Sequence, residues 1–176
     1  MRILSLFIVL ISLFSCNKSK DGTFNVLDYG ARGDSVTMNT SSLQAVIDRC
    51  SADGGGRVVF PPGKYLTGSL LLKDDVELHV MKGATIYGSA DSADYLHLIV
   101  DKKSFTRDGQ SHPSFFGLIM ADGADNIAVT GSGVIDGNGA HNEDFKCYPL
   151  SDEPNSPWHK PDRPKLFFFY NFHCLR

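Results

Sequence analysis

The sequence has no excess of basic residues, no cysteine pair with metal-binding spacing and no apolar run long enough to span a membrane. Its 17 Lys and Arg residues stand against 20 Asp and Glu, so the formal net charge is -3 and no basic surplus is available for nucleic-acid binding. None of the four cysteines forms a C-x-x-C motif, which argues against a zinc site. We therefore expect a globular chain with no metal, no cofactor and no nucleic-acid partner.

The first 15 residues are typical of an export signal. Arg2 precedes an apolar stretch, residues 3–14, that is shorter than the roughly 20 residues of a spanning helix. The following Leu13-Phe14-Ser15-Cys16 resembles a bacterial lipobox, whose cysteine is acylated and becomes the mature N-terminus. An ordinary signal followed by a chance cysteine is the alternative. The sequence thus predicts lipidation at Cys16, a polar tether over 16–22, and a protein exported to the bacterial cell envelope (periplasm or outer membrane) that meets the membrane only through its anchor.

The three cysteines beyond Cys16 are Cys50, Cys147 and Cys174. In an oxidising compartment an odd number allows at most one intramolecular disulfide among them, and their spacing does not choose the pair.

One helix is expected, near residues 40–52. Leu43, Val46, Ile47 and Cys50 fall at i, i+3, i+4 and i+7, which places them on one apolar stripe. Asn39, Thr40 or Ser41 can cap its start, and the glycines at 54–56 end it. A helix with a single apolar stripe must cover an apolar surface on one side only.

The rest of the chain is predicted to be all-β, built from short strands. In 76–80 the apolar residues alternate with Glu77 and His79, which places these two polar side chains on the opposite face. The other predicted strands are 57–60, 65–67, 69–72, 85–87, 117–120, 126–130, 133–136 and 166–170. Their connections are rich in Gly, Asn and Asp and are not helical, which excludes βαβ crossovers after Gly56. Few tight hairpin signals are present, so a parallel β-helix is favoured over a sandwich or jelly roll, although the period is irregular.

Several segments, in order, closely resemble the N-terminal third of glycoside hydrolase family 28, the polygalacturonase-like enzymes. They are Phe24-Asn25-Val26-Leu27-Asp28-Tyr29-Gly30-Ala31-Arg32-Gly33-Asp34, the stretch 54–68, the stretch 76–86, the stretch 126–139 and Arg163-Pro164-Lys165-Leu166. The resemblance implies a right-handed parallel β-helix over residues 23–176, covered at its N-terminal end by the 40–52 helix and truncated at its C-terminal side. The family usually carries an acidic pair where Met38-Asn39 stand, a difference expected to affect helix capping only.

Members of that family hydrolyse galacturonide linkages of pectic polysaccharide with inversion, which requires one carboxylic acid and one carboxylate base. The family supplies these groups from N-T-D, D-D, G-H-G and R-I-K motifs. Here Asn39-Thr40 is followed by Ser41 and lies in the helix, Asp74-Asp75 matches a non-catalytic turn, and the last two motifs do not occur. No catalytic residue can be assigned, and we expect the carboxylates beyond Arg176.

The resemblance thus implies the N-terminal fragment of an exported pectin-degrading hydrolase, inactive alone. A β-helix carbohydrate-binding or structural protein and part of a pectic lyase are the alternatives. The apolar segment 166–172 would form an exposed strand edge at the end of a shortened stack, so self-association is also expected.

A long polar loop, residues 141–162, interrupts the strand pattern. Its Tyr148, Trp158 and His159 are candidate contacts to a pectic oligosaccharide, because aromatic faces stack on sugars and long loops on rigid scaffolds often bind ligands. A loop that packs down its own aromatic side chains is an equally good interpretation.

Two further patterns have simpler explanations. Asp122, Asp125 and Asp136 would suit Ca²⁺ if they gathered, but isolated aspartates are common in turns. The glycines around Ser132 and Asn138 suggest phosphate loops, but neither pair leads into a helix, and turn glycines are the better interpretation.

Overall fold

The computed structural model describes residues 22–99, 106–107, 110–111, 114–139 and 165–170. The predicted signal, most of the tether and the loop 141–162 lie outside these residues. No helix within the described residues has the length and apolar character needed to cross a bilayer.

Parallel strands of three sheets follow one another in a fixed order, so that the chain winds into a solenoid. Sheet A holds β1 (Thr23–Asn25), β3 (Gly56–Phe60), β6 (Val76–Val80) and β12 (Ala128–Gly131). Sheet B holds β2 (Asp34–Met38), β4 (Gly63–Thr67), β7 (Ala84–Gly88) and β13 (Val134–Asp136). Sheet C holds β5 (Leu70–Leu72), β11 (Ser114–Asp122) and β14 (Lys165–Tyr170). The prediction of a right-handed parallel β-helix is confirmed.

The remaining described elements are short. A 3₁₀ turn, η1 (Val26–Tyr29), joins β1 to β2, and a second, η2 (Ser92–Asp94), follows β7. Strand β8 (His97–Ile99) pairs antiparallel with the start of β11, and β9 (Thr106–Arg107) pairs antiparallel with β10 (Gln110–Ser111). Of these, η2, β8, β9 and β10 belong to an excursion that leaves the solenoid after β7 and returns at β11.

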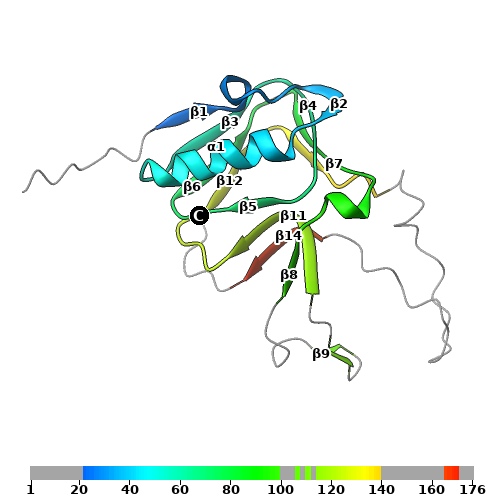
Figure 1. The fold of residues 1–176 in the computed structure, drawn as a ribbon. Helices are drawn as coiled ribbons and strands as arrows, with labels where there is room; N and C mark the ends of the chain where they lie inside the picture. Colours follow the sequence, from blue (N-terminus) through cyan, green and yellow to red (C-terminus); the bar gives the residue numbers. More distant parts are fainter. Residues whose placement is uncertain (1–21, 100–105, 108–109, 112–113, 140–164, 171–176) are drawn as a thin grey trace, which may run out of the picture.

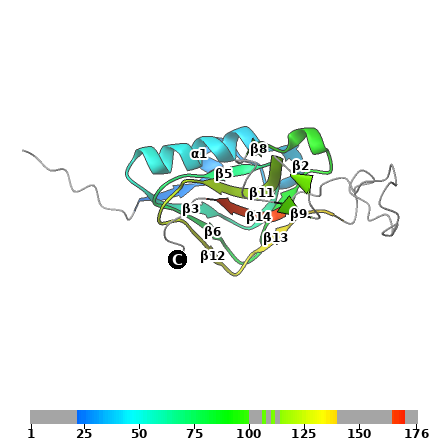
Figure 2. The ribbon, with the colours of Figure 1, turned by 90° about the horizontal axis from the view of Figure 1, so that it is seen from below.

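Helix α1 (Thr40–Ala52) occupies the position of sheet C in the first rung. Leu43, Val46, Ile47 and Cys50 are fully buried along one stripe, as their spacing predicts. Figure 1 shows α1, β5, β11 and β14 lying one beside the next in that order, and Figure 2 shows the same stack from below. The helix thus covers the first rungs on one side only.

A side-chain amide joins the helix to the sheet. Gln44 donates from Nε2 to the carbonyl oxygen of Leu71 and accepts from the Leu71 N–H at Oε1, each at 2.9 Å. Strand β5 pairs with β11 on its other side, where Leu71 lies beside Met120 in the register. Gln44 therefore satisfies the strand edge much as a neighbouring peptide group would.

Asn39 stands at the N-cap position, but its side chain does not cap the helix. Its Nδ2 lies within hydrogen-bond distance of the carbonyl oxygens of Arg32 (3.0 Å), Thr37 (2.7 Å) and Leu66 (3.2 Å). Its Oδ1 accepts from the Arg32 N–H at 2.7 Å. The expectation that asparagine replaces aspartate here simply as a cap is therefore wrong: the buried amide holds three backbone segments together.

Inward-pointing residues of the three sheets form one core. In β6, Val76, Leu78 and Val80 are buried while Glu77 and His79 point outward, as the alternation predicts. Tyr65 is fully buried, stacks edge-on against Phe60 at 5.6 Å, and donates its hydroxyl to the Pro61 carbonyl. This apolar interior is the rigid support for the outward-facing residues.

The corners between sheets C and A stack on one another. Gly55, Asp75 and Asn126 all have positive φ, at 95°, 60° and 54°. A Cβ on Gly55 would lie 2.4 Å from the Cβ of Asp75, so only glycine fits the first of these corners. The side-chain amide of Asn126 donates to Asp75, which joins the next two corners.

Candidate functional site

The outer face of sheet A carries a cluster of hydrogen-bonded polar side chains. Arg57 comes from β3, Glu77 and His79 come from β6, and Thr130 comes from β12; we call these four residues the sheet A cluster. Strand register sets Arg57 beside Glu77 and His79 beside Thr130. Three successive rungs thus contribute to one patch.

Each member of the sheet A cluster contacts the next. Arg57 Nε lies 2.9 Å from Glu77 Oε2. Thr130 donates its hydroxyl to Glu77 Oε1 at 2.5 Å, and His79 Nδ1 lies 2.8 Å from the same threonine oxygen. The side chains of Arg57, Glu77 and His79 are 51%, 24% and 30% exposed, so the cluster is open to solvent but partly shielded.

The electrostatics keep Glu77 ionised. Partial burial acts to raise the pKa of Glu77, but the hydrogen bonds from Thr130 and Arg57, together with the charge of Arg57, outweigh it and hold this pKa below its ordinary value. The carboxylate is therefore an acceptor with both oxygens already engaged. It holds the Arg57 and Thr130 side chains in place.

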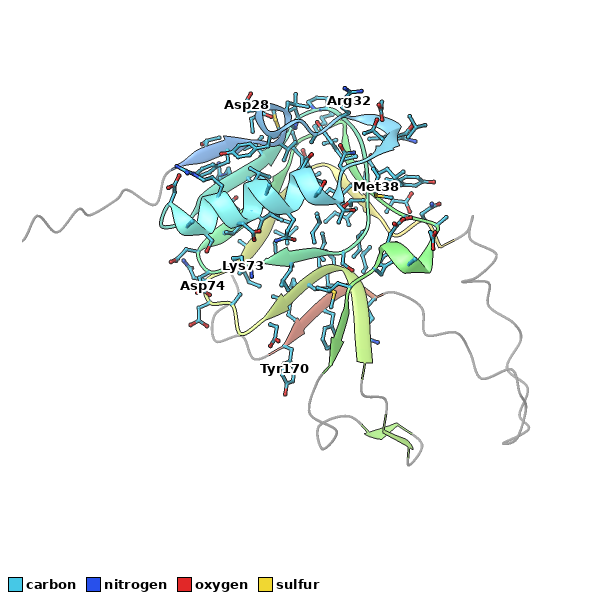
Figure 3. The ribbon with its side chains drawn as sticks, viewed as in Figure 1. Asp28, Arg32, Met38, Lys73, Asp74 and Tyr170 are labelled. Carbon is cyan, nitrogen blue, oxygen red and sulfur yellow. The ribbon has the colours of Figure 1, made fainter. Side chains whose placement is uncertain are left out.

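The outer faces of the other two sheets differ in character. On sheet B, Lys64 Nζ lies 5.8 Å from the centre of the Tyr87 ring, and the Tyr87 hydroxyl donates to Asn138 at 2.7 Å. On sheet C, Leu71, Met120 and Phe168 fall in one register row and pack together outside the solenoid. Tyr170 packs against this row at the end of β14, where Figure 3 shows it pointing away from the stack.

A buried serine closes the neck of the excursion between β7 and β11. Ser69 donates its hydroxyl to the Gly117 carbonyl at 2.6 Å and accepts from the Leu96 N–H at 2.8 Å. Nearby, Tyr95 donates to the Ser89 carbonyl at 2.8 Å. Burial, together with the charge of Asp94, raises the pKa of Tyr95 to about 12, so this phenol stays protonated at neutral pH. The group is suited to positioning the excursion.

The predicted acidic residues do not form a metal or acid–base site. Asp74 and Asp75 lie in the turn between β5 and β6, where Asp74 accepts from the Asp125 N–H at 2.8 Å. Figure 3 shows Asp74 at the periphery of the molecule. Asp122 and Asp125 flank a different corner from Asp136, and the described residues contain no group of three metal-ligating side chains. The glycines at 131 and 133 form the tight turn between β12 and β13.

The other predicted site residues fall largely outside the described part of the chain. This holds for the candidate sugar contacts Tyr148, Trp158 and His159, for the candidate lipidation site Cys16, and for Cys147 and Cys174. Cys50 is described: it is a free, fully buried thiol beneath α1. Burial, together with the charge of Asp53, raises the pKa of Cys50 to about 11, so it is a packing residue and not a nucleophile.

Sequence reasoning placed Glu77 and His79 on an outward face but did not connect them to Thr130. The partners in this pair of rungs lie far apart in sequence: 51 residues separate His79 from Thr130, Tyr87 from Asn138, and Asp74 from Asp125. Only 20 separate Arg57 from Glu77. The signal that could have revealed the pairing is this repeated separation of 51 residues between polar side chains of the two rungs.

The three-sheet solenoid, with one covering helix and polar side chains on its outer faces, defines this chain as a parallel β-helix protein. It belongs to the family described as rhamnogalacturonase A/epimerase, pectate lyase-like, whose sequence model matches residues 23–143. The predicted relationship to the polygalacturonase-like enzymes is confirmed.

Individual proteins are also similar to this chain in sequence or in structure. The chain is 39% identical over 121 residues to an exo-poly-alpha-D-galacturonosidase of Dickeya chrysanthemi, covering 65% of this chain and 19% of that enzyme. It is 40% identical over 80 residues to the mannuronan C5-epimerase AlgE4 of Azotobacter vinelandii, covering 40% of this chain and 14% of that protein. Among solved structures, a hyperthermoactive exopolygalacturonase of Thermotoga maritima matches with a TM-score of 0.64 and 30% identity, over 86% of this chain and 40% of that one. The chain thus spans a minor part of each of these proteins.

Proposed function

We propose that the chain forms the N-terminal rungs of a polygalacturonase-like glycoside hydrolase that acts on pectic polysaccharide by inverting hydrolysis. In this proposal the chain builds the start of the solenoid and contacts the polymer. None of the described residues acts as the catalytic acid or base in this proposal, so the described rungs do not hydrolyse the polymer by themselves.

The match to the Dickeya galacturonosidase is the observation that carries the proposal. It extends over 121 residues, and the family match from 23 to 143 takes in strands of all four rungs. An outward-facing arginine and an aromatic residue beside a lysine also suit a polymer of acidic sugars, because guanidinium groups pair with carboxylates and aromatic faces stack on sugar rings.

Affinity electrophoresis tests the substrate class. We expect the chain to be retarded in gels that contain polygalacturonate and not in gels that contain neutral galactan. Equal mobility in both gels would overturn the proposal. A parallel gel with polymannuronate separates pectic from alginate-type polymers.

A uronan epimerase or lyase is the second candidate, favoured by the similarity to AlgE4. It predicts stronger retardation by polymannuronate than by polygalacturonate. For a longer protein that contains these rungs, unsaturated sugar products would indicate elimination, whereas saturated products would indicate hydrolysis.

We also propose that the chain is exported and lipid-anchored through Cys16 at the bacterial cell envelope. The support is the cationic start, the short apolar stretch and the lipobox-like sequence that precede Cys16. Labelling cells with a fatty acid that carries a clickable group should tag the protein, and Cys16→Ser should abolish the tag. A soluble, untagged wild-type protein would contradict the anchor.

Self-association through β14 is the last part of this proposal. Leu166 and Phe167 on this strand are 39% and 41% exposed, and exposed apolar side chains on a strand favour pairing with a second copy. Light scattering at tens of micromolar should detect oligomers that Phe167→Lys reduces. A monomeric wild-type chain at that concentration would refute this part.

A further inference from the structure

The hydrogen bonds of the sheet A cluster determine which nitrogen of a neutral His79 carries the hydrogen. Glu77 is an ionised carboxylate and can only accept hydrogen bonds, whereas the Thr130 hydroxyl has one proton. Thr130 gives that proton to Glu77 Oε1 at 2.5 Å. The hydrogen between Thr130 and His79, whose atoms lie 2.8 Å apart, must therefore come from His79 Nδ1. A neutral His79 thus carries its hydrogen on Nδ1 and keeps the lone pair of Nε2 as an acceptor.

Arg57 supplies donors beside this acceptor. Its Nε is engaged by Glu77 Oε2 at 2.9 Å, and its side chain is 51% exposed. Among the described residues, the hydrogen bonds of Arg57 run through Nε alone and those of His79 run through Nδ1 alone. The two terminal nitrogens of Arg57 and the Nε2 of His79 are thus available to a ligand on the same outer face.

The spacing of these groups suits a single sugar ring. Arg57 and His79 are diagonal neighbours on adjacent parallel strands, offset by two residues. One strand spacing and two residue rises place their Cβ atoms about 8 Å apart. A ligand that fits must offer a carboxylate to the guanidinium and, a few ångströms away, a hydroxyl that donates to Nε2. A sulfate ion lacks the donor, a single phosphate ion is too small to reach both groups, and neutral sugars lack the carboxylate.

We propose that Arg57 and His79 form a contact site for a uronic acid unit on the outer face of sheet A, in which Thr130 and Glu77 act as positioning residues that fix the His79 tautomer. Arg57 pairs with the sugar carboxylate, and His79 Nε2 accepts from a ring hydroxyl. The choice of a pectic uronic acid as the natural ligand rests on the proposed function. The geometry alone requires only a carboxylate beside a hydroxyl.

Nuclear magnetic resonance of the full chain with ¹⁵N-labelled histidine tests the site. The long-range proton–nitrogen spectrum should show His79 with its hydrogen on Nδ1, and His79→Asn identifies the signal. Trigalacturonate should shift this signal saturably, while galactotriose should not. Arg57→Gln and Thr130→Val should each weaken the trigalacturonate response about tenfold, the effect of losing one charge-assisted contact or its positioning. Thr85→Val, on the outer face of sheet B, is the matched control and should bind as the wild type does.

The outcomes separate this site from the proposed function. A His79 signal that ignores trigalacturonate overturns the site even if polygalacturonate still retards the protein in gels. A saturable shift by galacturonic acid in a protein that no polygalacturonate gel retards supports the site and overturns the proposed function. A hydrogen on Nε2, or a Thr130→Val variant that binds as tightly as the wild type, overturns the positioning role.

Discussion

Asn39 joins three backbone segments at the point where the chain passes from β2 into α1. It is 1% exposed, and its amide nitrogen faces three carbonyl oxygens. A carboxylate has the same shape but no hydrogen to donate. The helix and its start were readable from the sequence, whereas this role was not, because the Leu66 carbonyl reaches Asn39 only after β4 has taken its place in the next rung.

The substitution Asn39→Asp should therefore destabilise the protein. It removes the donors and sets a negative oxygen against carbonyl oxygens, which costs roughly 2–4 kcal/mol in the free energy of unfolding. Urea denaturation measures the change. Ser41→Ala, at an exposed position in the first turn of α1, should stay within about 0.5 kcal/mol of the wild type. An Asn39→Asp variant as stable as that control would show that the amide contributes little.

The hydrogen bonds to Asp34, another single residue, can be tested through the pH dependence of stability. Hydrogen bonds from the Thr37 backbone and hydroxyl and from the Val36 backbone lower the pKa of Asp34 to about 2. Because the folded pKa is depressed, the stabilising contribution is complete above the ordinary value of 3.8 and is lost as the pH falls towards about 2. Thr37→Val removes the hydroxyl donor and should raise the Asp34 midpoint in a carbon-detected carboxyl titration. Identical midpoints in wild type and variant would be the contrary result, and Thr85→Val serves as the control.

At the scale of the elements, α1 covers the free edge of β5, which is the first strand of sheet C. The apolar stripe of α1 and the in–out alternation of β6 follow directly from residue spacing and were predicted. Strands β1 and β2 were not predicted, because they are short, largely polar and defined by pairing with β3 and β4. The amide bridge from Gln44 to Leu71 was equally hidden, since 27 residues separate its partners.

Replacing Gln44 by leucine should weaken this junction. The variant leaves the N–H and the carbonyl of Leu71 without their partner beneath α1, which costs about 1–3 kcal/mol. Hydrogen exchange should show the Leu71 amide exchanging faster than in the wild type. Asp48→Ala removes only the exposed partner of Gln44, 3.0 Å from Nε2, and should leave Leu71 protected. Unchanged Leu71 exchange in Gln44→Leu would mean that the helix does not seal this edge.

At the scale of the whole molecule, a regular solenoid is interrupted by long connections between strands of sheets B and C. One joins β7 to β11, and the chain between β13 and β14 is similarly long. This explains why the sequence period looked irregular although the strand register is continuous in sheet A from β1 to β12. The buried residues determine how the rungs stack, and outward-facing residues of successive rungs contact one another.

Our central claim is the proposal that the described rungs contact a pectic polymer and do not hydrolyse it by themselves. The neighbouring carboxylates of Asp74 and Asp75 are bonded to the next corner, and Glu77 is bonded to Thr130 and Arg57. An assay of new reducing ends after incubation of the purified chain with polygalacturonate tests the claim most directly. We expect saturable binding and no reducing ends above the buffer control. Release of reducing ends in proportion to the amount of chain would contradict the claim.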